Sequence, residues 1–214
     1  MNPISKTELW HAQAALIVAI ILQVTLSKSL SFGPRYLTAS LELILVFIIG
    51  FTAPRRHLRA KPLPMHQILS ALFIALISLA NTVSLVLLIR ALINGSNLGG
   101  RTLLSGAIAI FLTNIIVFCL WYWELDSPGL SGVIKDNKGK PKHFQFPQTV
   151  GQKDGNWKPT FFDYLYVSIT NSTAFSPTDT MPLSHSAKLL MSAQALVALL
   201  TVVLVTARAV NILG

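Results

Sequence analysis

The sequence has little charge and almost no cysteine. Only 12% of its 214 residues are charged and 52% are hydrophobic, whereas an ordinary soluble domain is about 25% charged. The single cysteine, Cys119, allows neither an intrachain disulfide nor a thiolate metal cluster. The Gly-x-Ser-x-Gly elbow of hydrolases and the Gly-Lys-Ser motif of phosphate-binding loops are absent as well. We therefore exclude a typical soluble enzyme and predict no enzyme activity and no cofactor.

Acidic residues are also scarce, with 8 Asp and Glu against 17 Lys and Arg. Ten of these 17 basic residues lie in two polar connections, 54–66 and 124–160. This concentration between apolar runs is typical of loops at a membrane surface and not of a nucleic-acid interface. The histidines lie in loops or at the ends of apolar runs, and none has a second ligand at metal spacing, so we predict no metal site.

Long apolar runs dominate the rest of the chain. In lipid, each backbone polar group must be paired within the protein, so a run that crosses the bilayer should be a helix. The sequence predicts an all-α, multi-pass integral membrane protein of the plasma membrane, with five transmembrane helices in contact with lipid. The predicted spans are 12–30, 36–53, 67–93, 103–123 and 187–213. The predicted parts are a four-helix region (1–123), a polar loop rich in Lys, Gly and Pro (124–159) and a final region (160–214).

The segment 160–186 does not have the pattern of a full span. A helix through it would place Asp163, Asn171, Pro177 and Asp179 in hydrocarbon, where each polar group needs a partner. About a dozen moderately apolar residues precede the polar ones, and the last predicted span follows directly. We therefore predict a re-entrant helix and loop: a short helix enters the membrane and the chain returns extended on the same side.

Several residues of this segment form a run with a known counterpart. The chain reads Asp163-Tyr-Leu-Tyr166-Val-Ser168, continues from Thr173 to Asp179, and then has Met-Pro182-Leu. The run resembles the pore domain of the potassium-channel superfamily, and the preceding Phe-Pro is similar to an uncharacterised family of small bacterial multi-span membrane proteins. The resemblance implies a homotetramer in a bacterial inner membrane that conducts monovalent cations. It also implies that Asp163, Tyr166 and Ser168 pack the pore helix.

The chain departs from that family at the filter itself. Ser176-Pro177-Thr178 replaces Gly-Tyr-Gly. A non-Gly residue in a left-handed conformation costs roughly 1–2 kcal/mol, and proline has a fixed φ and no N–H, so a queue of backbone carbonyls should not form. We predict instead a weakly selective, Gly-less filter lined by hydroxyl groups and Asp179 carboxylates. The predicted ion pathway comprises Thr173, Ala174, Phe175, Ser176, Pro177, Thr178 and Asp179.

Polar residues within the other spans admit two interpretations. In the last span, Gln194, Thr201 and Arg208 lie seven residues apart and therefore form one stripe. The stripe either lines a water-filled pore or bonds neighbouring helices. For Asn81 and Asn114, each in the middle of a span, we predict hydrogen bonds between helices.

Glu42 is the one acid deep inside an apolar run. An intramembrane carboxylate is costly and usually has a partner or a role in proton transfer. We favour a structural ion pair or a protonated carboxyl over a transport site. Two other functions stay open: a secondary transporter with a midplane site at Glu42 and 160–186, and a non-conducting scaffold that keeps a pore-domain fold. The lack of an inverted repeat disfavours the transporter.

The orientation of the chain in the membrane has conflicting indicators. The channel resemblance places the N-terminus outside, because pore loops of potassium channels enter from that side. The linker 54–66, with four basic residues, favours an N-terminus inside, and we follow this stronger indicator. In a third arrangement, 160–178 spans fully and both termini lie inside.

Overall fold

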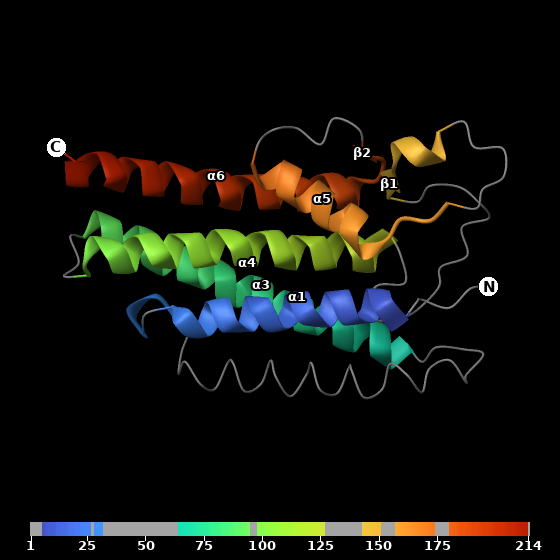
Figure 1. The fold of residues 1–214 in the computed structure, drawn as a ribbon, viewed down its shortest axis with the longest axis horizontal. Coiled ribbons are helices and arrows are strands. Elements are labelled where there is room, and N and C mark those ends of the chain that lie inside the picture. Colours follow the sequence, from blue (N-terminus) through green and yellow to red (C-terminus); the bar gives the residue numbers. More distant parts are fainter. Residues whose placement is uncertain are drawn as a thin grey trace.

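The computed structural model describes residues 6–26, 28–31, 64–94, 98–126, 143–150, 157–173 and 180–213. Long helices make up most of this part of the chain (Figure 1). They are α1 (Lys6–Thr25), α3 (Pro64–Ile93), α4 (Gly100–Asp126), the shorter α5 (Phe161–Ser172) and α6 (His185–Leu213). Short elements join them: the 3-10 helices η1 (Lys28–Leu30) and η3 (Pro147–Thr149) and the two-residue strands β1 (Phe144–Gln145) and β2 (Met181–Pro182).

Helix α4 is the centre of the bundle. It packs against α1, α3, α5 and α6, and Figure 1 shows it between α1 on one side and α5 with α6 on the other. More of α4 is buried than of any other candidate span, since 61% of its apolar window is covered, against 22% for α6. The other helices therefore owe their positions mainly to contacts with α4.

Two hydrophobic clusters show the directions of the helices. One cluster joins the early part of α1 to Ile74 of α3, Trp123 of α4 and Ala187 of α6. The other joins η1 to Leu88 of α3 and Leu103 of α4. The first cluster thus combines the first halves of α1, α3 and α6 with the last half of α4, and the second cluster contains the start of α4. Helices α1, α3 and α6 therefore run in one direction, and α4 runs in the other. We call the end of the bundle that holds Trp123 the aromatic end.

Three helices are long and apolar enough to cross a membrane, as judged by length and composition. They comprise Ile68–Ile93, Gly100–Asp126 and His185–Ala207. These helices coincide with the spans predicted at 67–93, 103–123 and 187–213, although α4 begins three residues earlier and continues three residues further. The fold is thus mostly helical and compatible with a membrane protein.

The first two predicted spans have different outcomes. For the span predicted at 12–30, the structure has a shorter apolar helix, Trp10–Thr25. The helix ends at Thr25, and the polar residues around Lys28 follow in η1. The span predicted at 36–53 lies outside the described residues.

The predicted polar loop 124–159 contains ordered structure in its described part. Residues 143–150 form β1 and η3. Strand β1 pairs with β2 in an antiparallel two-stranded sheet, with Phe144 opposite Pro182. The Leu183 amide extends this pairing by donating to the His143 carbonyl at 2.8 Å. The segment just before α6 is therefore attached to the loop that precedes α5.

Candidate functional site

Helix α5 is half the length of a transmembrane helix. Its 12 residues extend over about 18 Å at 1.5 Å per residue, whereas the hydrocarbon core is about 30 Å thick. The helix starts at the aromatic end, where Phe161 contacts Trp123 with ring centroids 5.5 Å apart. Strand β2 and the start of α6 lie at the same end. A helix of this length cannot cross the membrane alone, which disfavours the arrangement in which 160–178 spans fully.

Asp163, a predicted pore-helix packing residue, caps the start of α5. Its Oδ2 accepts hydrogen bonds from the Thr160 backbone N–H at 2.6 Å and from the Thr160 hydroxyl at 2.7 Å. These contacts satisfy a free donor at the helix N-terminus, and the negative charge complements the helix dipole there. Asp163 therefore sets where α5 begins.

The two tyrosines of α5 lie on opposite faces. Tyr164 is fully buried, whereas Tyr166, the second predicted packing residue, is 57% exposed. The buried face also carries Phe161 and Ser168, and the exposed face carries Phe162. Tyr164 is not among the predicted packing residues of this helix, because those residues follow from the resemblance to the potassium-channel pore domain. Tyr164 follows Phe161 by three residues and Ser168 follows Tyr164 by four, and this spacing is the sequence signal for one buried helical face.

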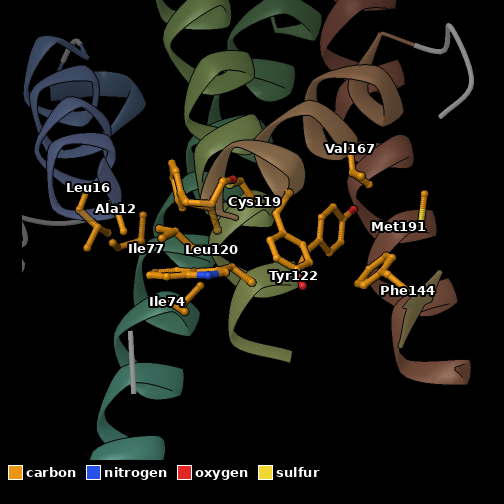
Figure 2. Packing of buried hydrophobic residues seen from close by; sticks show 14 of the residues in the cluster. Ala12, Leu16, Ile74, Ile77, Cys119, Leu120, Tyr122, Phe144, Val167 and Met191 are labelled. Carbon is orange, nitrogen blue, oxygen red and sulfur yellow. The ribbon is translucent and has the colours of Figure 1, made fainter. Parts of the chain in front are cut away.

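Aromatic side chains enclose the first half of α5. Phe144 and Phe146, both almost completely buried, have ring centroids 6.2 and 5.4 Å from that of Tyr164. Phe144 also makes an edge contact with Tyr122 at 5.2 Å, and Phe146 contacts Trp157 at 5.5 Å. Figure 2 shows how the wider cluster extends from α1 through α4 to Phe144. These rings hold the loop around β1 and the start of α5 against α4.

A buried polar network encloses the second half of α5. Gln194 of α6 has no exposed surface. Its Nε2 donates to the Ser168 carbonyl at 3.0 Å and approaches the hydroxyl oxygens of Ser168 and Ser172 at 2.6 and 2.7 Å. Its Oε1 accepts from Asn171 Nδ2 at 2.8 Å and from the Tyr122 hydroxyl. One amide thus connects α4, α5 and α6.

The predicted polar stripe of α6 is covered by this chain's own helices where its side chains are described. Thr201 is 1% exposed, and its hydroxyl bonds to the Val197 carbonyl within α6 at 2.7 Å. Gln194 takes part in the network above, which matches the alternative of bonding between helices. The side chain of Arg208 lies outside the described part of the molecule.

The other predicted intramembrane amides connect helices, as expected. Asn81 Nδ2 donates to the Ile110 carbonyl of α4, and Asn114 Nδ2 donates to the Gln194 carbonyl of α6, each at 3.3 Å. Ser168, the third predicted pore-helix residue, is fully buried and donates to the Ile115 carbonyl of α4 at 2.6 Å. These bonds confirm that Asn81 and Asn114 join neighbouring helices.

The predicted ion pathway is described only at its first residue. Thr173 is the C-cap residue that follows α5 and is exposed, and its hydroxyl donates to the Ile169 carbonyl at 3.0 Å. The other predicted pathway residues, Ala174, Phe175, Ser176, Pro177, Thr178 and Asp179, lie outside the described residues, as does Glu42. The chain is described again from Thr180, which is buried next to β2.

No metal site is found among the side chains that could be searched. Within the described ranges, no three His, Cys, Asp or Glu side chains lie close enough together to hold a metal ion. Cys119 is a buried free thiol in α4. Comparisons with known protein families, with curated proteins and with solved structures found no match for this chain. The likeness to the potassium-channel pore domain therefore stays a prediction from the sequence.

Proposed function

We propose that this chain is a multi-pass protein of the plasma membrane that conducts monovalent cations passively through a pore built by several copies. The constriction would be Thr173–Asp179, directly after α5. The observation that supports this proposal most is the half-length helix α5, which starts at the aromatic end and ends inside the bundle. The start of α5, at Phe161, and the strand β2 that follows this helix in the chain lie at the same end. That arrangement suits a re-entrant segment that is enclosed by protein.

The direction of α5 favours positive ions. A helix carries about half a negative charge at its C-terminus, and α5 ends at Ser172, next to the proposed constriction. The hydroxyl groups and the Asp179 carboxylate of that segment add oxygen ligands and negative charge. A wider, hydrated constriction of this kind would distinguish sodium from potassium only weakly.

The uncovered helix faces are apolar, as a membrane oligomer requires. On α6, Leu189 is 71% exposed and Leu196 61% exposed. On α5, Phe162 and Tyr166 are more than half exposed. In the proposed homotetramer these faces would contact lipid or neighbouring copies, while the segments after α5 surround the axis.

A liposome flux assay tests the proposal. Purified protein is reconstituted into liposomes loaded with potassium or sodium, and we expect rapid leak of both cations. Asp179→Asn should reduce the leak or its preference for cations over anions, because a ring of carboxylates is lost. Asp136→Asn, in the predicted polar loop, is the matched control and should leak like the wild type. A correctly inserted protein without leak under any gradient would overturn the proposal.

The same assay examines a second function, coupled transport. The end of α5 at Ser172, well short of a full span, and the strand β2 before α6 are also typical of transporters, whose discontinuous helices bind substrate near the midplane. A transporter would show uptake that depends on an ion gradient and saturates. It would lose that uptake in Asp179→Asn or Glu42→Gln. A scaffold would show neither leak nor uptake.

A further inference from the structure

Gln194 is a fully buried polar side chain with several hydrogen-bond partners. Both polar atoms of its amide have protein partners, and all of the partner side chains lie on α4 or α5. The partners on α5 are Ser168, Asn171 and Ser172, which are the residues of its last turn and a half. The amide therefore bonds the part of α5 that immediately precedes Thr173.

Asn171 attaches the same turn to the backbone of α6. Its Nδ2 donates to the Met191 carbonyl at 2.9 Å, in addition to Gln194 Oε1 at 2.8 Å. Two amides from facing helices thus hold the end of α5 at one height on α6. The neighbouring residues Ile169 and Thr173 point away from this contact and are exposed. Together with the bond from the Ser168 hydroxyl to the Ile115 carbonyl of α4 at 2.6 Å, the network attaches the end of α5 to its neighbours.

We propose that Gln194 is a positioning residue for the ion pathway: together with Asn171 it sets the position of Thr173, the first residue of the proposed pathway, and thereby sets ion preference without touching the ion. The inference rests on the proposed function for its effect on ions. Its mechanical part, the placement of Thr173, does not depend on conduction. The reason is geometric, because a shift of the last turn of α5 along α6 moves the first residue of the constriction by the same amount.

Asn81 provides a matched comparison inside the same bundle. It is also a buried amide in a membrane helix, 4% exposed, and it donates one hydrogen bond to α4. Its Oδ1 has no hydrogen-bond partner within the described structure, and its bond links α3 to α4 without α5. If the loss of any buried amide changed ion preference, substitutions of Asn81 and of Gln194 should change it alike. If the placement of Thr173 matters, only the substitution of Gln194 should change ion preference.

The first test measures ion preference in liposomes. Gln194→Met keeps the volume of the side chain and removes the amide, and Asn81→Leu is the control. We expect Gln194→Met to change the ratio of potassium to sodium flux by about threefold or more, a factor that corresponds to one average hydrogen bond in a membrane protein. Asn81→Leu should leave the ratio as in the wild type. Equal ratios in all three proteins would overturn the role in ion preference.

The second test measures the position of Thr173 directly and needs no conduction. Cys119 is the only cysteine of the chain and is fully buried, so a Thr173→Cys protein presents one accessible thiol to a membrane-impermeant maleimide. We expect Gln194→Met to change the labelling rate by about threefold or more, on the same hydrogen-bond scale, and Asn81→Leu to leave it unchanged. An unchanged rate in Gln194→Met would overturn the inference. A changed rate in a protein that does not conduct would leave the placement role standing and remove the proposed function.

A milder variant and a double substitution complete the design. Ser172→Ala removes a single partner of Gln194, and it should shift both readouts in the same direction as Gln194→Met but less. If Gln194 and Asn171 act as one unit, Asn171→Leu added to Gln194→Met should change the labelling rate little further, because coupled residues are not additive. Additive effects of the two substitutions would contradict the proposed joint action.

Discussion

The hydroxyl of Tyr164 donates a hydrogen bond to Asp126 Oδ2 at 2.9 Å, and this contact joins the first turn of α5 to the last residue of α4. The other oxygen of the same carboxylate accepts the backbone N–H groups of His143 at 2.8 Å and of Phe144 at 3.3 Å. One carboxylate therefore holds α4, α5 and the start of β1 together. With Gln194 near the other end, the half-length helix has a polar attachment at both ends.

The two tyrosines of α5 provide the first prediction. Tyr164→Phe should lower the free energy of unfolding by about 1.5–3 kcal/mol, the usual value of a hydrogen bond to a charged group. Tyr166→Phe, on the exposed face, should have almost no effect. Thermal unfolding in one detergent measures both. Equal losses in the two variants would show that the bond to Asp126 contributes little.

Phe144 should be essential for the attachment of β2. Phe144→Ala removes a ring that is 2% exposed and packs against Tyr122 and Tyr164, and such changes cost about 3–5 kcal/mol. Because β1 pairs with β2, the amide of Leu183 should also exchange with solvent deuterium faster. Phe162→Ala, which removes a 55% exposed ring, is the control. If Phe144→Ala leaves this exchange rate unchanged, β2 is held by other contacts.

Close packing at Gly106 predicts that alanine destabilises the protein at this position but not at Gly99, just before α4. A Cβ at Gly106 would lie 2.8 Å from Cδ1 of Leu30, whereas a Cβ at Gly99 would meet no atom within 4 Å. Gly106→Ala must displace the Leu30 side chain, and overpacking of this kind costs about 1–3 kcal/mol. Gly99→Ala should be neutral or slightly stabilising, because alanine restricts the unfolded chain. Midpoints of thermal unfolding for the two variants test this difference.

Glu8 should make stability depend on pH. Partial burial at the start of α1 raises the pKa of Glu8 above 4.5, the negative charge of Asp163 raises it further, and His11 opposes both effects. A carboxyl with a raised pKa in the folded state stabilises the fold fully below its unfolded pKa, and this contribution is lost as pH rises through the folded pKa.

Glu8→Gln tests this sign. The variant should be more stable than the wild type at pH 7, where charged Glu8 destabilises the fold. The advantage should shrink as pH falls toward the ordinary value of 4.5, because the wild-type carboxyl becomes protonated as well. Unfolding curves at several pH values provide the measurement. An advantage that is constant with pH would assign the effect to packing and not to charge.

The long helices follow from local properties of the sequence. The apolar runs of α3, α4 and the last helix, α6, are long enough to cross a bilayer, so their approximate bounds could be predicted without knowledge of their neighbours. The bonding roles of Asn81 and Asn114 were also predictable, because an amide inside such a run needs a partner on another helix. The end of α1 at Thr25 differs from the predicted end of that span at residue 30.

The candidate site depends on contacts between residues far apart in the chain. Tyr164 and Asp126 are 38 residues apart, and Phe144 meets Pro182 across the small sheet. The sequence placed Gln194 on a stripe of α6 but did not identify the helix that the stripe faces. Its partners on α5 became evident only once α5 was seen against α4 and α6.

The sequence by itself predicted a mostly helical membrane protein with five spans, and three of these are helices long and apolar enough to span a membrane in the described part of the chain. It also indicated that 160–186 differs from a simple span. These properties depend on composition and on neighbours within a few turns. Only the tertiary structure decided which face of α5 is buried, where that helix is attached and which polar groups share the core. Hydrogen bonds and ring contacts act over a few ångströms, so their partners depend on how the helices pack and not on their order in the chain.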